Sequence, residues 1–399
     1  MINKRYVLFT RIDLIKSQSG KIFCDPLWAK DLKLHLDYIT DFRICCPIIY
    51  DNDVQGLENI TDYPIKHIFE LKKDYGLGSI AKNIIPNFFS VMEACKEANI
   101  VHSGGAGWAF PLSFYLLLLR PFFSFQWSTL IESSFWMLGK DEEPNIRKLI
   151  EHYLYKVILS RCLKQSDARI FTQSFYRKFF LKEETKQTLI APAIWLDNDI
   201  IVSSEMVKQR LLPRTGKILE IIFPARLIED KGVLILFDAI KLLKNMDVTV
   251  NITIMGSGKL EKDCRKFVMG NFGSVTVKYC EPIKYGIEFF NFLRNYDIVL
   301  VPNLKEEQPR IIFDAFSQGL GVIASNTSGI LDITRDGKNA VICQKGNAQS
   351  LAQAISYVVE NPELALRMGL NGLDYVSGKS HLQMHLDRQS FLVEVLDID

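Results

Sequence analysis

The chain has 399 residues, enough for two domains of ordinary size. Apolar residues make up 48% of it and charged residues 24%, which excludes a disordered chain and a coiled coil. The 48 Lys and Arg against 46 Asp and Glu leave a net charge of +2, which argues against nucleic acid as a partner.

In the first half, short strand-like runs alternate with longer helical patterns. The runs are rich in β-branched, aromatic or leucine residues and end at Pro, Gly or polar residues, which predicts strands. The predicted strands are 6–10, 42–47, 99–102, 122–127, 168–172 and 188–191, and the predicted helices are 26–36, 84–98 and 146–165. This alternation indicates a parallel sheet with helices on both faces.

One stretch, 108–127, is apolar apart from Arg120 and long enough to span a bilayer. Pro111 and Pro121 interrupt it, so we expect a short buried helix at 111–119 followed by the strand at 122–127. The N-terminus has no apolar segment followed by a cleavage site, so no signal peptide is expected. The expected location is therefore cytoplasmic.

Cysteine and histidine usage indicates a reducing compartment and no metal. The eight cysteines form no C-x-x-C pair and several lie in apolar runs, which favours buried free thiols. Among the six histidines only His381 and His385 have helical i, i+4 spacing, and no acidic ligand is adjacent.

After a polar stretch at 198–216 the same alternation starts again. The predicted strands are 219–224, 248–255, 275–279, 298–302 and 322–325, and the predicted helices are 232–244, 287–295, 310–317 and 348–360. The sequence therefore predicts an α/β protein with two Rossmann-like, doubly wound domains in series. In such a protein we expect the ligand where strand carboxyl ends face an interdomain cleft.

Two loops of the second half have residues suited to phosphate. Arg226 follows the strand at 219–224, and Lys231 and Gly232 open the next helix. Two cations and a helix N-terminus can converge on a diphosphate, although two cations in a solvated loop are the alternative. Gly256 and Gly258 follow the next strand and permit close backbone approach to a ligand, or form an ordinary tight turn.

The segment 302–325 adds two carboxylates. Glu306 lies in the loop after a strand, and Asp314 lies eight residues later in a helix. Carboxylates beside cations can accept hydrogen bonds from hydroxyl groups while the cations hold phosphates, which indicates a sugar nucleotide. The alternative is a solvated turn and a helix-surface residue.

Together these motifs resemble the donor half of retaining glycosyltransferases of family 4, which have the GT-B fold. The resemblance rests on Arg226…Lys231-Gly232, Gly256-x-Gly258, the strand after Asp297, and Glu306-x7-Asp314, in this order. It implies an acceptor-side domain at 1–205, a donor-binding domain at 206–380, and a last helix within 381–399 that crosses back onto the first domain.

The resemblance also implies roles for these residues. Arg226 and Lys231 would bind the donor diphosphate and, with Glu306, form the catalytic set. Glu306 would contact hydroxyls of the transferred sugar, Asp314 the ribose, and Gly256 and Gly258 would line the donor site.

The chain departs from the family pattern in the loop 306–309. The family often has Glu-Gly-Phe-Gly, whose backbone amides contact the sugar, whereas this loop reads Glu-Glu-Gln-Pro. Pro309 has no N–H, so we expect Gln308 or Arg310 to replace that donor. The family also has Glu where Asp314 stands.

The resemblance implies transfer of a hexose-type sugar, with retention, from a UDP- or GDP-linked sugar to an acceptor hydroxyl. The product would be a surface polysaccharide, glycolipid or glycoside. No cofactor or metal is expected, because two cations can replace the metal. The alternatives are a catalytically weak nucleotide-sugar-binding partner subunit, and a GT-B enzyme of other chemistry such as an inverting transferase or an epimerase.

The first half offers acceptor-side candidates at the ends of predicted strands. His102, Gly104 and Gly105 follow the strand at 99–102 in a Gly-rich loop, and Glu132 follows the next strand. For His102 the alternative is a strand-end histidine with a backbone partner. Gly20 stands in the region where the family has a glycine pair near the diphosphate.

The region 147–186 combines positive charge with aromatic residues. It has ten Lys and Arg against four acidic residues, interleaved with six Tyr and Phe. That composition suits an anionic membrane surface and a lipid-linked acceptor, and predicts peripheral binding to the inner leaflet. Solvated helix faces over an aromatic core are the alternative.

Overall fold

The computed structural model describes residues 1–105, 110–133, 135–138, 144–181, 183, 185–212 and 217–398. It divides into unit 1, Met1–Ala193 with Leu382–Asp399, and unit 2, Ile194–His381. Parts of several sequence predictions lie outside the described residues. These parts are 213–216 of the polar stretch, 106–107 of the Gly-rich loop, 108–109 of the apolar stretch, Lys182 and Glu184 of the basic region, and 399 of the C-terminal segment.

Unit 1 is built on a mainly parallel sheet, with the strand order β10-β9-β8-β7-β1-β4-β2-β3-β5 and β6 paired to β4. Its strands are β1 Ile2–Phe9, β2 Leu14–Lys16, β3 Ile22–Cys24, β4 Ile39–Tyr50, β5 Glu58–Asn59, β6 His67–Leu71, β7 Ile100–Gly104, β8 Gln126–Ile131, β9 Ala168–Phe171 and β10 Thr188–Ile190. Its helices are α1 Pro26–Leu36, α2 Leu77–Glu97, α3 Ser113–Leu119, α4 Ile146–Gln165, α5 Ser174–Phe180 and α14 His381–Val395.

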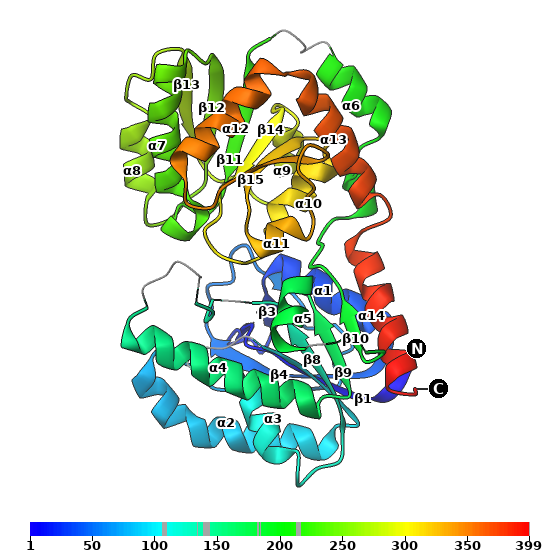
Figure 1. Cartoon of the computed structure of the whole chain (residues 1–399). Helices are drawn as coiled ribbons and strands as arrows, with labels where there is room; N and C mark the ends of the chain where they lie inside the picture. The colour runs from blue at the N-terminus through cyan, green and yellow to red at the C-terminus, as the bar shows by residue number, and fades with distance from the viewer. Residues whose placement is uncertain are drawn as a thin grey trace. The chain divides into compact units, whose positions relative to one another are not determined.

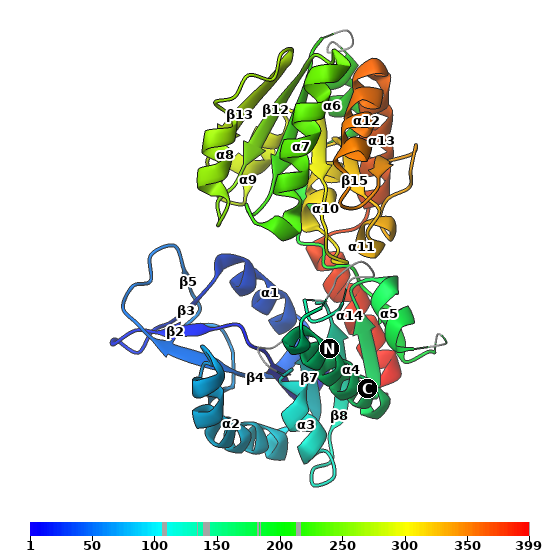
Figure 2. The same ribbon diagram turned by 60° about the vertical axis from the view of Figure 1, so that its left-hand side comes forward.

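The central strands of unit 1 are apolar on both faces, so both faces carry helices. Tyr6 and Leu8 of β1 belong to a core shared with α1 and α14, whereas Val7 and Phe9 belong to a second core shared with α2 and α3. Figure 2 shows α1 and α2 on opposite sides of this sheet. The last helix therefore completes the core of the N-terminal unit.

Unit 2 repeats the design with a fully parallel sheet in the order β13-β12-β11-β14-β15-β16 (Figure 1). Its strands are β11 Leu219–Pro224, β12 Val250–Met255, β13 Val275–Cys280, β14 Ile298–Val301, β15 Gly321–Ser325 and β16 Ala340–Cys343. Its α-helices are α6 Ser204–Leu211, α7 Val233–Leu243, α8 Glu261–Phe267, α9 Ile287–Leu293, α10 Arg310–Ser317, α11 Ser328–Leu331, α12 Ala348–Glu360 and α13 Glu363–Val376. Alternate residues of β11 and β14 face two separate cores.

Most predicted elements are confirmed, and the strand at 122–127 is wrong in position. The chain turns after α3, where the Phe122 amide bonds to the Leu119 carbonyl, and β8 begins only at Gln126. All eight cysteines are free and seven are buried, as predicted. Among the described helices, none has the length and apolar character to cross a bilayer.

Candidate functional site

The main candidate site lies where the strand order of unit 2 reverses, between β11 and β14. The crevice beyond the carboxyl ends of two such strands is the usual ligand position in an open α/β sheet. A pocket of about 220 Å³ lies there. Its charged and polar lining includes Arg226, Lys231, Asn303, Tyr285, Arg310 and Asp314.

The two predicted phosphate-binding cations differ in how they are held. Arg226 is exposed, and within the described residues its side chain has no hydrogen bond or ion pair. Lys231 is partly buried and its ammonium pairs with the Glu307 carboxylate, which also accepts a hydrogen bond from Asn303 Nδ2 at 3.3 Å. Arg226 can therefore bind an anion directly, whereas the ion pair between Lys231 and Glu307 must break before Lys231 can bind one.

Glycines position these cations by letting two loops touch. Gly256 and Gly258 adopt φ of +147° and +148°, and a Cβ on Gly256 would lie 1.9 Å from the Ala225 carbonyl oxygen. Neither glycine lines the pocket. Contact with the loop that carries Arg226 therefore explains the need for glycine here without any ligand.

We expect Gly232→Ala to destabilise the protein by more than about 2 kcal/mol. Gly232 has φ +80°, and its Cβ would lie 2.1 Å from the Pro302 carbonyl oxygen, so strain and a clash combine. Urea denaturation measures the change. Gly337→Ala is the control, because Gly337 has φ +69° with no atom within 4 Å of its Cβ. Equal losses in the two variants would contradict the packing argument.

Glu306 is held as an ionised group beside the pocket residues. Its Oε2 accepts from the Ser328 backbone N–H at 2.6 Å, and its Oε1 accepts from Lys345 Nζ at 3.2 Å. Partial burial alone would raise the pKa of Glu306, but the bonds from Ser328 and Lys345 outweigh it and lower the pKa. An ionised carboxylate suits the predicted role as acceptor of hydrogen bonds from sugar hydroxyls.

Asp314 lies on α10 with only 6% of its surface exposed. Its Oδ1 accepts a hydrogen bond from the Tyr285 hydroxyl at 3.0 Å. Burial raises the pKa of Asp314 to about 7, although Tyr285 and Arg310 both act to lower it. Near neutral pH both the protonated and the ionised carboxyl are therefore populated, and either form can hydrogen-bond to the hydroxyl groups of a diol.

Two further polar residues, Gln308 and Arg310, lie at the start of α10. The Arg310 guanidinium lies 5.3 Å from the centre of the Trp195 ring. Gln308 does not line the pocket, but both polar atoms of its amide are buried and have no hydrogen-bond partner among the described residues. An orphaned amide beside the pocket keeps Gln308 as a candidate contact.

Sequence reasoning missed Tyr285, Asn303 and Lys345. Folding brings these residues to the site from separate parts of the chain. Tyr285, for example, lies just before α9 and belongs to no recognisable motif. The partner of Lys231 left a weak signal in the sequence. Glu307 is the second acid of the loop after β14, and in the structure it pairs with Lys231 from the loop after β11.

In unit 1 the acceptor-side candidates separate into two places. His102, Gly104 and Glu132 lie at the carboxyl ends of the adjacent parallel strands β7 and β8, and the Gly105 amide bonds to the Leu130 carbonyl. Gly20 lies apart from them, in the turn between the antiparallel strands β2 and β3.

His102 is buried, and its partner is a side chain rather than the backbone. Its Nδ1 lies 2.5 Å from the Tyr6 hydroxyl. Burial, with lesser effects of His35 and Arg388, lowers the pKa of His102 to about 3. His102 is therefore neutral at physiological pH.

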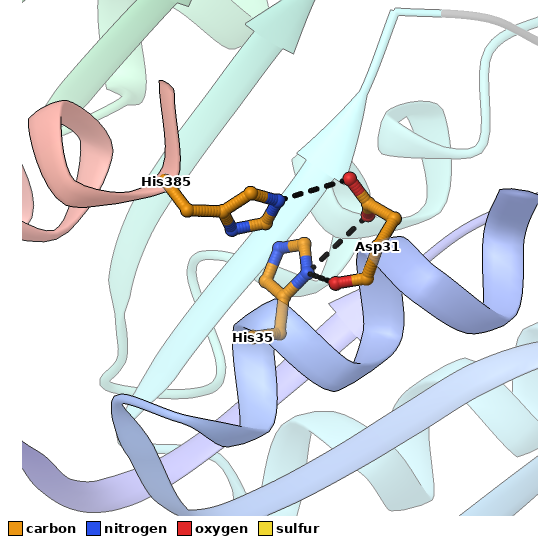
Figure 3. A group of neighbouring side chains, drawn as sticks. All are labelled: Asp31, His35 and His385. Carbon is orange, nitrogen blue, oxygen red and sulfur yellow. Dashed lines mark hydrogen bonds and ion pairs between the residues drawn. The ribbon is translucent and has the colours of Figure 1, made fainter. Parts of the chain in front are cut away.

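A buried network of Asp31, His35 and His385 joins α1 to α14 (Figure 3). His385 Nε2 lies 3.0 Å from Asp31 Oδ1, and His35 Nδ1 lies 2.9 Å from the Asp31 carbonyl oxygen. One ligand atom from each residue lies within 4.8 Å of the others, which makes this the one metal-sized group among the described residues. Hydrogen bonds between these groups explain the arrangement, and metal independence stays a prediction.

His381 and His385, the two histidines with helical i, i+4 spacing, have different neighbours in the structure. His381 stacks on Trp195, with ring centroids 4.7 Å apart, while His385 faces Asp31. The helical spacing was correct, but the two rings meet different neighbours.

Comparison with known proteins points to one enzyme class. Residues 206–374 match the family model for glycosyl transferases group 1. The chain is 28% identical over 225 residues to an uncharacterized glycosyltransferase of Methanocaldococcus jannaschii, a match that spans 53% of this chain and 62% of that relative. It is 21% identical to the N,N'-diacetylbacillosaminyl-diphospho-undecaprenol alpha-1,3-N-acetylgalactosaminyltransferase of Campylobacter jejuni, over 75% of both chains.

A third relative is the capsular polysaccharide biosynthesis glycosyltransferase of Staphylococcus aureus, 24% identical over 41% of this chain and 42% of that one. The chain thus covers less than two thirds of the archaeal and staphylococcal relatives.

Solved structures share the whole fold. Sucrose-phosphate synthase from Thermosynechococcus elongatus superposes with a TM-score of 0.70 at 15% identity, covering 100% of both chains. Anabaena HepE, solved with UDP and glucose, gives 0.65 at 13% identity, covering 99% of this chain and 100% of that one. The predicted fold, two Rossmann-like domains of the GT-B type, is confirmed.

Proposed function

We propose that this protein is a glycosyltransferase that moves a hexose-type sugar, with retention, from a nucleotide sugar to an acceptor hydroxyl. Its product would be a surface polysaccharide, glycolipid or glycoside. The observation that supports this most is the pocket at the β11–β14 switch point. Arg226, Lys231 and Asp314 line that pocket, and they fall within the segment that matches the glycosyltransferase family model.

The proposed chemistry depends on two cations that stabilise the leaving group, and it uses no nucleophilic side chain. As the bond between the sugar C1 and the phosphate oxygen breaks, negative charge develops on the diphosphate, and Arg226 and Lys231 would stabilise it. The acceptor oxygen bonds to C1 from the same side and passes its proton to the leaving phosphate oxygen. Glu306 would hold hydroxyls of the sugar and Asp314 those of the ribose. In this proposal no metal takes part.

A catalytically weak, nucleotide-sugar-binding partner subunit is the second candidate. The pairing of Lys231 with Glu307 favours it, since that pair blocks one of the two cations. The loss of a backbone donor at Pro309 favours it too.

Thermal melting with UDP, GDP, ADP and dTDP tests the donor site. UDP heads the panel because HepE, which shares the fold, was solved with it. A nucleotide present at 100 times its Kd adds about 2.7 kcal/mol of stability, which a melting curve detects. We expect UDP or GDP to raise Tm. Turnover of the matching nucleotide sugar, unchanged in EDTA, would support the enzyme, whereas binding without turnover would favour the partner subunit.

We also propose that unit 1 binds the cytoplasmic face of an anionic membrane, where a lipid-linked acceptor would lie. The aromatic residues at 175–180 do not support this, because they pack around Trp136 in the core. The support comes from α4, whose outer face has exposed Ile146, Ile150, Tyr153 and Val157.

Positive charge flanks that apolar stripe. Arg147, Lys156, Arg161 and Lys164 are exposed along α4, with Glu151 less exposed. Helix α3 packs against both α2 and α4. Further exposed apolar side chains are Ile85 and Phe89 of α2, Leu118 of α3, and Phe122 in the turn after α3. An apolar face bordered by cations is the pattern of a helix that lies in an anionic interface.

The double variant Ile150→Glu, Val157→Glu is expected to reduce binding to phosphatidylglycerol vesicles at low salt by more than about tenfold, because two apolar side chains can no longer enter the interface and two added negative charges are repelled by the anionic lipid. Vesicle co-sedimentation measures this. Met269→Glu is the control, since Met269 is 84% exposed in unit 2. If the wild-type protein does not co-sediment with these vesicles, the membrane proposal is wrong.

A further inference from the structure

Arg388 on α14 is a buried cation to which the described residues supply no hydrogen-bond or ion-pair partner. Only 6% of its surface is exposed, and its Nε is fully buried with no hydrogen-bond partner. Across the described ranges its side chain forms no hydrogen bond or ion pair. Because burying an unpaired charge is costly, a fold retains one mainly where a ligand supplies the counter-charge.

One candidate for that counter-charge, the Asp31 carboxylate on α1, already has two imidazole partners. His385, one turn before Arg388 on the same helix, meets Asp31 Oδ1 at 3.0 Å, and His35 Nδ1 lies 3.3 Å from Asp31 Oδ2 (Figure 3). Both carboxylate oxygens therefore face imidazoles. This network ties α14 to α1 and so fixes the helix turn from which Arg388 projects.

Arg388 lies near the strand ends that carry the acceptor-side candidates. One turn before it on α14, the His385 ring lies 4.6 Å from the His35 ring, which in turn lies 6.4 Å from the His102 ring of β7. In agreement with this placement, the charge of Arg388 affects the pKa of Glu132 after β8 and of His102. Glu132 is an exposed residue, but the dense surroundings of its carboxyl raise its pKa, with Asp31 adding to the rise and Arg388 opposing it. His102 and His385 are neutral, so Arg388 is the cation of this cluster.

We propose that Arg388 binds a phosphate group of the acceptor at the carboxyl ends of β7 and β8. A guanidinium offers paired N–H donors that match the oxygens of a phosphate, and its planar fork gives a fixed geometry. The identification of the ligand as an acceptor rests on the proposed function. The recognition of a phosphate rests on Arg388 and its surroundings alone.

The test uses the full chain with Arg226→Gln as background, so that the pocket of unit 2 contributes little phosphate binding. Calorimetric titration with inorganic pyrophosphate and with geranyl diphosphate is compared in this background, with added Arg388→Gln, and with added Arg388→Lys. We expect Arg388→Gln to weaken geranyl diphosphate binding by about tenfold or more, since a charge-assisted hydrogen bond is lost. Arg388→Lys should retain part of the affinity.

The two phosphates distinguish the source. A stronger effect of Arg388→Gln on geranyl diphosphate than on pyrophosphate supports a lipid-linked acceptor, and equal effects support phosphate recognition without a lipid. Unchanged binding of both ligands would overturn the proposal.

Stability separates a ligand site from a structural one. An unsatisfied cation contributes no stability, so Arg388→Gln should melt at or above the wild-type Tm. A variant that melts lower, or fails to fold, would mean that Arg388 is structural and would also overturn the proposal. UDP and GDP melting shifts measured with Arg226 intact should be unchanged by Arg388→Gln, so failure of the donor site would be recognised separately.

Discussion

Replacing Arg226 or Lys231 with Ala is expected to lower the rate of sugar transfer by about 10²–10³, because each would stabilise charge that develops on the leaving diphosphate. Both side chains line the pocket where β11 meets β14. The nucleotide that raises Tm of the wild type should also lose most of its effect in each variant. Transfer from the matching nucleotide sugar and thermal melting are the two measurements.

Two control variants sharpen this expectation. Lys241→Ala removes an exposed lysine of α7 that pairs with Asp238, and should change neither rate nor nucleotide binding. Glu307→Gln frees Lys231 from its ion pair, so nucleotide affinity should rise. If Lys231→Ala transfers sugar at the wild-type rate, the assignment of the diphosphate site is wrong.

Asp314→Asn is expected to stabilise the protein above pH 7 while it weakens nucleotide binding. The pKa of Asp314 rises from 3.8 to about 7, chiefly because the carboxyl is buried. A shift of that size corresponds to as much as about 4 kcal/mol. Asparagine keeps an acceptor for the Tyr285 hydroxyl but has no charge to bury, so Tm should rise by several degrees.

The contribution of the Asp314 carboxyl to the free energy of unfolding changes with pH. The unfolded chain loses this proton near pH 4 and the folded chain near pH 7, so the folded state binds more protons between these values. Stability of the wild type therefore falls as pH rises from about 4 to 7, and the full cost of the buried carboxylate is present above pH 7.

Melting curves at pH 5 and pH 8 measure the difference, with the exposed Asp238→Asn as control. Asp314→Asn should gain stability at pH 8 and little at pH 5. An equal effect at both values would contradict the raised pKa.

The regular elements of unit 2 could be predicted closely. The strand at 219–224 and the helices at 310–317 and 348–360 occur as expected, because their apolar residues recur at the spacing of a strand or a helix and clear boundary residues close them. Short strands such as β2, β3 and β5 were missed, since a strand of only two or three residues shows no periodicity.

Candidate residues were predictable where they follow a strand end. Arg226, Lys231 and Asp314 do meet at one pocket, because parallel strands bring their carboxyl ends to one edge. Their partners were not predictable: Glu307 on Lys231, Ser328 and Lys345 on Glu306, and Tyr285 on Asp314 come from other loops.

The sequence alone determined the α/β class, the two doubly wound units and the strand-end positions of the cations and carboxylates, since periodicity and boundary residues are local properties of the chain. Only the tertiary structure decided which charges are paired, which carboxyl is buried and which histidines meet. Asp31 and His385 are 354 residues apart in sequence and 3.0 Å apart in space. Contacts of this kind depend on side-chain packing between distant segments, and no local pattern encodes them.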